Sequence, residues 1–188
     1  MPDNSPILGR RIFPVVLGVD PGSRVTGYGV ISQEGNRLIH IASGTIRLRE
    51  KAPLEQRLMK IHEELKRRID EASADVMALE AVFYAQNVRS TVALAQARGV
   101  AILAAAQAGI PVVEYSAMEV KKAVVGYGRA TKDQVTEMMR RLFALGRTFV
   151  LEPDAGDALA VALCHLNTES TRRRVEKAEL AQISGGVS

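Results

Sequence analysis

The stretch VVLGVDPGSRVTGYGVI, residues 15–31, decides the fold that we expect for this chain. Its first six residues form a short β-branched run that is typical of a buried strand. This run ends at Asp20, and Pro21 and Gly22 follow as a tight turn. A carboxylate at the edge of a core is costly unless a cation faces it. Because Arg24 is the one cationic side chain nearby in the sequence, a metal ion is a serious candidate for the partner of Asp20.

Length and composition are those of an ordinary globular protein. Of the 188 residues, 47% are hydrophobic and 24% are charged, with a net charge of +4. We expect one domain over residues 15–168, a flexible arm at residues 1–14 and a mobile tail at residues 169–188. A single cysteine, Cys164, excludes disulfides within the chain and cysteine-rich zinc sites. We find no signal-peptide pattern and no apolar run of membrane-spanning length, so we expect a cytoplasmic protein with no membrane partner.

The hydrophobic pattern along the chain predicts an α/β fold. The expected order is three strands, a helix, a strand, a long alanine-rich helix, a strand and three further helices, which begin at or near residues 15, 24, 37, 54, 75, 88, 111, 117, 131 and 153. The first three strands are joined by short turns and should form an antiparallel meander. The last helix is expected to end near residue 166. We therefore predict a mixed five-stranded sheet, an antiparallel meander followed by parallel strands, with helices on its faces.

Four acidic residues have unusual settings in this pattern. Asp20 ends the first predicted strand, and Glu80 is a lone charge in the buried run VMALEAVF. Asp154 and Asp157 lie three residues apart on the last helix and therefore face the same way. Taken singly, Asp20 is better explained as a turn residue and Asp154 as a helix-end residue, whereas Glu80 contradicts the composition of a buried strand. Three segments that share this oddity instead favour one carboxylate site, which could hold one or two Mg²⁺ or Mn²⁺ ions and activate water against a phosphodiester.

Cationic residues gather in one part of the chain. Residues 116–147 contain seven lysines and arginines against three acids, an excess equal to the net charge of the whole chain. A localised basic patch is typical of a protein that binds a polyanion such as nucleic acid. A solvated helix face gives the same pattern, so the patch alone leaves both interpretations open.

Several segments, taken in order, resemble the RuvC family of Holliday-junction resolvases. They are GVDPGSRVTGYGVI, ALEAVFYAQNVRS with QARGVAI, YSAMEVKKAVVGYGRATKDQV and DAGDALAVALCH, spread over residues 15–165. The resemblance implies a ribonuclease H-like fold and a homodimer that makes symmetric, Mg²⁺-dependent nicks in four-way DNA junctions during recombination and repair. It also implies the RuvA–RuvB branch-migration complex as a partner.

The resemblance further implies roles for individual residues. The acidic positions of the family fall on Asp20, Glu80, Asp154 and Asp157, although some relatives carry His at the position of Asp154. Phe83 matches an aromatic residue that stacks on an unpaired base near the crossover. The remaining matches are basic. Two of them, Lys121 and Lys132, correspond to residues near the scissile phosphate. Three more are expected to contact other phosphates: Lys122, Arg129 and Arg98.

Three other functions compete with this assignment. An ATP-binding enzyme of the actin and sugar-kinase type has a similar opening strand and turn, but it needs two such domains and a second glycine-rich loop. A non-catalytic DNA-binding protein would use the basic segment alone, and four acids beside that segment would repel phosphates. A ribosomal RNA-processing nuclease on the same fold is the closest rival, and a comparison of junction and RNA substrates separates the two.

Overall fold

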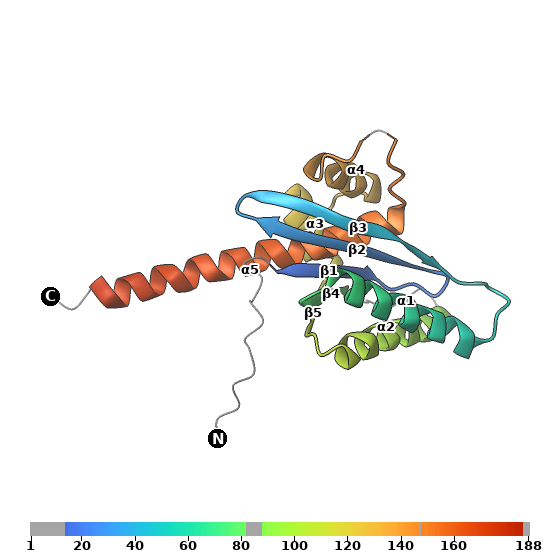
Figure 1. The fold of residues 1–188 in the computed structure, drawn as a ribbon. Coiled ribbons are helices and arrows are strands. Elements are labelled where there is room, and N and C mark those ends of the chain that lie inside the picture. The colour runs from blue at the N-terminus through green and yellow to red at the C-terminus, as the bar shows by residue number, and fades with distance from the viewer. Residues whose placement is uncertain (1–13, 82–87, 147, 186–188) are drawn as a thin grey trace, which may run out of the picture.

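The computed structural model describes residues 14–81, 88–146 and 148–185. A five-stranded sheet with the spatial order β3-β2-β1-β4-β5 forms its centre (Figure 1). The strands are β1 (Val15–Asp20), β2 (Val25–Glu34), β3 (Arg37–Arg47), β4 (Val76–Glu80) and β5 (Val112–Tyr115). β2 pairs antiparallel with both β1 and β3, whereas β4 pairs parallel with both β1 and β5. The predicted antiparallel meander followed by parallel strands is thereby confirmed.

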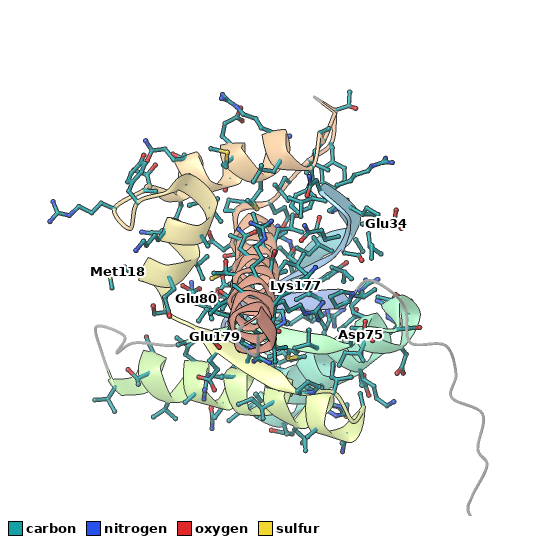
Figure 2. All side chains as sticks on the ribbon, turned by 90° about the vertical axis from the view of Figure 1, so that its left-hand side faces the viewer. Glu34, Asp75, Glu80, Met118, Lys177 and Glu179 are labelled. Carbon is teal, nitrogen blue, oxygen red and sulfur yellow. The ribbon has the colours of Figure 1, made fainter. Side chains whose placement is uncertain are left out.

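Five helices cover the two faces of the sheet. They are α1 (Leu54–Ala72), α2 (Val88–Gln107), α3 (Ala117–Val125), α4 (Lys132–Leu142) and α5 (Pro153–Gly185). The alternation of side chains along β1 divides the core: Leu17 packs with α1 and α2, whereas Val16 packs with α3, α4 and α5. Figure 2, which looks along α5, shows this helix in the middle of the molecule, with α3 and α4 above it and α1 and α2 below the sheet. None of the described helices combines the length and apolarity that a membrane span requires.

The beginning of α5 lies directly against the backbones of β1 and β2. A Cβ atom built on Gly18 would stand 2.0 Å from the carbonyl oxygen of Ala158, and one on Gly27 would stand 1.9 Å from that of Asp154. Only glycine permits such a close approach. The first turns of α5, which carry Asp154 and Asp157, are therefore held against the carboxyl-terminal half of β1 and the strand beside it.

α5 is longer than the sequence predicts. We expected a helix that ends near residue 166 and a mobile tail at residues 169–188, but the helix continues to Gly185 and extends beyond the sheet (Figure 1). From residue 171 to 180 its residues are exposed. Helix-forming residues and the ion pairs of Arg172 with Glu169 and Glu176, at 3.4 and 3.1 Å, support this extension. The predicted arm at residues 1–14 lies, except for Pro14, outside the described residues.

Candidate active site

Strand pairing brings Asp20 and Glu80 together. β1 and β4 are parallel, with Val19 opposite Leu79, so the next residue on each strand ends two neighbouring strands at the same edge of the sheet. Both side chains belong to the face that α5 covers, because Ala78 packs against that face and Glu80 follows two residues later. The two carboxyl groups share a hydrogen bond. The structure therefore brings the two strand-end acids side by side.

Burial and neighbouring charge make Asp20 hard to ionise. Desolvation is the largest cause, followed by the charges of Glu80 and Asp157, and together they raise the pKa of Asp20 to about 8. Burial also raises the pKa of Glu80, although the hydrogen bond from Asp20 lowers it. Because burial and mutual repulsion disfavour two charges in one small site, the two carboxyl groups share a proton. The pair thus carries one negative charge rather than two at neutral pH.

Lys132 provides the positive charge beside this pair. Its position at the start of α4 is set by a capping box, in which Thr131 and Gln134 bond to each other's backbone N–H groups. The Lys132 Nζ donates a hydrogen bond to Asp157 Oδ2 at 2.6 Å. This bond is the largest cause of the raised pKa of Lys132. The ammonium therefore stays charged at physiological pH, and it neutralises Asp157, whose side chain is only 15% exposed.

A pocket of about 140 Å³ lies next to these groups, and Asp20 is not among its lining residues. Its polar lining consists of Glu80, Asp157, Lys121 and Lys132, and its apolar wall consists of Ala117, Val120, Val135 and Val161. The positive charge of Lys121 acts on Glu80 from α3 and opposes the rise in the pKa of that carboxyl. Two carboxylates and two ammonium groups thus face one small space, at the place where α3, α4 and α5 meet the sheet.

The start of α3 is fixed by a capping box that the sequence interpretation missed. Ser116 and Glu119 form a second capping box, in which the Ser116 side chain accepts from the Glu119 N–H and the Glu119 carboxylate accepts from the Ser116 N–H. The Ser-x-x-Glu spacing is a readable helix-start signal. It holds α3 in the position from which Lys121 reaches the pocket.

Not every predicted site residue lies in this group. Asp154 is one turn before Asp157 and does not line the pocket, although its charge helps to raise the pKa of Lys132. Lys122 and Arg129 are exposed on α3 and on the loop after it, also outside the pocket lining. Arg98 is on α2, below the opposite face of the sheet, where its guanidinium pairs with Glu114. Phe83 lies outside the described residues, so its stacking role stays a prediction.

The donor set suits a hard divalent cation, but the ligands are not yet gathered around one point. Within residues 14–81, 88–146 and 148–185, no three His, Cys, Asp or Glu side chains are arranged to hold a metal ion. The carboxylates are not arranged around one point because Asp20 and Glu80 are hydrogen-bonded to each other and Asp157 is hydrogen-bonded to Lys132. Carboxylate oxygens are the ligands that Mg²⁺ and Mn²⁺ prefer, and a cation would replace both the proton that Asp20 and Glu80 share and the ammonium on Asp157. The residues therefore fit such an ion once Lys132 moves aside.

The model of the family described as crossover junction endodeoxyribonuclease RuvC matches residues 16–165. The chain belongs to the RuvC family. The RuvC of Geobacter sulfurreducens is 52% identical over 153 residues, which cover 81% of this chain and 92% of that protein. The RuvC of Magnetococcus marinus is 48% identical over 171 residues, which cover 91% of this chain and 94% of that protein. Endonucleolytic resolution of four-way DNA junctions, in recombination and repair, is therefore the function of this chain.

Solved structures agree with this assignment. Thermus thermophilus RuvC has a TM-score of 0.76 and 29% sequence identity, over 84% of this chain and 96% of that one. The same RuvC in complex with a Holliday junction substrate has a TM-score of 0.75 and 26% identity, with the same coverage of both chains. The yeast mitochondrial resolvase Ydc2, at 14% identity and a TM-score of 0.62, shares the fold. The predicted ribonuclease H-like fold is thereby confirmed.

Proposed function

We propose that this chain nicks four-way junctions in symmetric pairs and that Asp20, Glu80 and Asp157 hold one or two divalent cations, Mg²⁺ or Mn²⁺, for this step. The observation that carries the proposal is the meeting of three carboxyl groups from β1, β4 and α5 beside two lysines. Once all three acids are ionised as ligands, they would repel the polyanion that is cut there, and bound cations remove that repulsion. The chemistry that a bound divalent ion supplies at such a site is a water of lowered pKa and neutralised phosphate oxygens.

The chain's own groups prepare the site for that chemistry. Asp20 releases the proton that it shares with Glu80 to solvent water, and both carboxylates would then be available as ligands. Lys132 keeps its proton, and its side chain is 69% exposed, so its ammonium can turn from Asp157 to a phosphate oxygen. Lys121 lines the same pocket from α3 and offers a second ammonium to the substrate. Asp154 supports the site from one turn away through its charge on Lys132.

We extend the proposal to a two-fold dimer, because two equal cuts in opposed strands need two sites related by symmetry. α2 offers an apolar surface for a second copy: Val88, Val92 and Leu103 are 80%, 50% and 50% exposed. The roles of Phe83, Lys122, Arg129 and Arg98 in DNA binding and the RuvA–RuvB partner rest on the family resemblance, whereas the cytoplasmic location is an expectation from the sequence pattern. They stay predictions.

The test is cleavage of a labelled synthetic four-way junction by the purified chain with Mg²⁺ and with EDTA. We expect paired nicks with Mg²⁺ alone, and we expect Glu80→Gln to bind the junction but not to nick it. The matched control is Asp133→Asn, an exposed acid next to Lys132 that does not line the pocket and should nick normally. Nicking by Glu80→Gln at the wild-type rate, or nicking in EDTA, would refute the assigned site. Equal cleavage of a structured RNA would instead favour the RNA-processing rival.

A further inference from the structure

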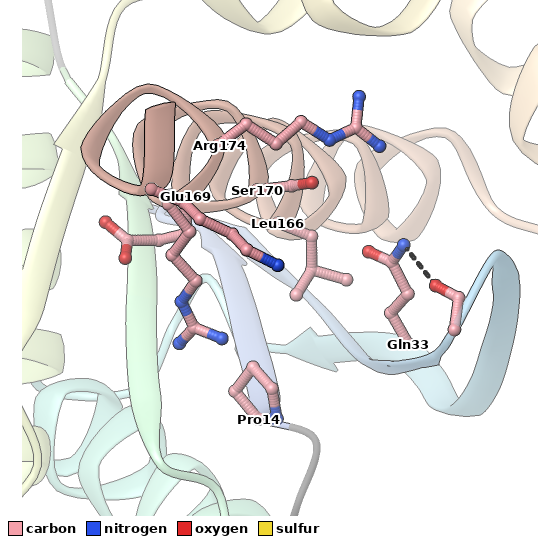
Figure 3. Close-up of a pocket in the computed structure, with 9 residues that line it drawn as sticks. Pro14, Gln33, Leu166, Glu169, Ser170 and Arg174 are labelled. Carbon is pink, nitrogen blue, oxygen red and sulfur yellow. Dashed lines mark hydrogen bonds between the residues drawn. The ribbon is translucent and has the colours of Figure 1, made fainter. Parts of the chain in front are cut away.

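A second cavity, of about 330 Å³, lies at the other end of the sheet from the carboxylates. We call it the distal groove; it runs between α5, the β2–β3 turn and the residue before β1 (Figure 3). Its floor includes Pro14 and Leu166, and three cations line it, Arg173, Arg174 and Lys177. Because Pro14 precedes β1 and Asp20 ends it, the whole length of that strand separates the groove from the acids.

The basic lining continues an apolar face of α5. Leu166, Arg173 and Lys177 are spaced by seven and four residues and therefore share one side of the helix. Leu166, where α5 still covers the sheet, is only 4% exposed. Arg173 and Lys177, where α5 has passed the sheet, are exposed. The side of the helix that packs on the protein's own core thus becomes cationic once that core ends.

Among the described residues, these three cations have no anionic partners of their own. In the described part of the chain, Arg173, Arg174 and Lys177 take part in no ion pair. The neighbouring Arg172, in contrast, pairs with both Glu169 and Glu176. Glu169 is the one carboxylate that lines the groove, and this ion pair already engages it. Like charges that gather without counter-charges repel one another, and a polyanion relieves this repulsion. The cavity is therefore built for a partner with several negative charges.

We propose that the distal groove binds the phosphate backbone of a duplex arm of the junction. This inference rests on the proposed function, because the junction is the polyanion that the active site already requires. From Asp157 to Lys177 is twenty residues of helix, about 30 Å, which equals about nine base pairs of duplex DNA. The groove thus contacts an arm well away from the cut. It adds affinity that depends on salt and arm length, and it takes no part in the chemistry.

The test compares two junctions in fluorescence binding and nicking assays. One has long arms of about 25 base pairs, and the other has arms of about six base pairs closed by hairpin loops, too short to reach the groove. The variant Arg173→Ala/Arg174→Ala/Lys177→Ala should bind the long-arm junction about tenfold more weakly at 0.1 M salt, with a salt slope up to about 2.7 units shallower. This deficit should shrink to less than about twofold on the short-arm junction, because neither protein can use the groove there.

Arg172→Ala is the matched control. It removes a cation from the same turn of α5, but this cation is already paired with Glu169 and Glu176. It should bind both junctions like the wild type, and circular dichroism should show unchanged helix content in both variants, since alanine favours helix. If the triple variant binds the long-arm junction with the affinity and salt slope of the wild type, the proposal is overturned. An acidic protein segment would then be the remaining candidate for the groove. An equal deficit on both junctions would also overturn it. Wild-type nicking of either junction tests the proposed function separately, because it requires no groove variant.

Discussion

Replacement of Asp20 by Asn should stabilise the metal-free protein at neutral pH, and the gain should depend on pH in a defined way. The fold raises the pKa of Asp20 from 3.8 to about 8, so the ionised form is disfavoured in the folded state. Below about pH 4, Asp20 is protonated in both the folded and the unfolded chain and costs nothing. Between about pH 4 and pH 8 the unfolded chain ionises and the folded one does not, so stability falls by about 1.4 kcal/mol per pH unit.

At pH 7 the accumulated cost is about 4 kcal/mol, three pH units above the ordinary pKa. Asn cannot ionise and avoids this cost, and its amide N–H can still donate to Glu80. We therefore expect Asp20→Asn to have a free energy of unfolding that exceeds the wild-type value by up to about 4 kcal/mol at pH 7 and by almost nothing at pH 4. The variant should also fail to nick junctions.

Urea unfolding in EDTA at pH 4, 5.5 and 7 measures these differences. The matched control is Asp75→Asn, a carboxylate that accepts a hydrogen bond from the Val15 N–H at the opposite end of β1 and should lose stability rather than gain it. A stability difference for Asp20→Asn that stays constant with pH, or a variant less stable than the wild type at pH 7, would refute the argument. Added Mg²⁺ should narrow the gap, because a bound cation favours ionised Asp20 in the wild type alone.

Three further predictions concern the lysine, the close packing and the dimer. Lys132→Ala should slow single-turnover nicking about 100-fold while it changes junction affinity much less; equal losses in both would make Lys132 a binding residue only. Gly18→Ala should destabilise the protein by about 3 kcal/mol in urea unfolding, because the new Cβ meets the Ala158 carbonyl oxygen. Gly146→Ala, where a Cβ would meet nothing within 4 Å, should be neutral or stabilising by up to about 1 kcal/mol, and similar values for both glycines would contradict the packing argument. Val92→Glu should convert a dimer to a monomer in analytical ultracentrifugation, and an unchanged mass would remove α2 from the interface.

The sheet and the meeting of the acids could be predicted because both follow from local patterns. Strand periodicity and turn residues predict five strands, and a lone acid at each of two strand ends predicts a common edge. The bond from Lys132 to Asp157 could not be predicted in the same way, since 25 residues separate the partners and nothing local orients one toward the other.

Two further features also depend on tertiary structure. Arg98 lies on α2, away from the carboxylates, because a basic residue in a helical pattern does not reveal which face of the sheet its helix covers. The extension of α5 lacks the apolar stripe by which a packed helix is recognised, so the sequence resembles a tail there. In both cases the missing information is the identity of the neighbouring surface.

The proton shared by Asp20 and Glu80 and the ion pair of Lys132 with Asp157 affect the order in which DNA and the cation bind. With one proton shared by Asp20 and Glu80, and with the Lys132 ammonium beside Asp157, the resting centre is less negative than its carboxyl groups alone would make it. A DNA strand can then settle there before any ion arrives. Under the proposed metal-dependent mechanism, recognition of a branched molecule and its scission are therefore separable, and the arrival of the divalent cation, rather than the encounter with DNA, would set the moment at which the strand is broken.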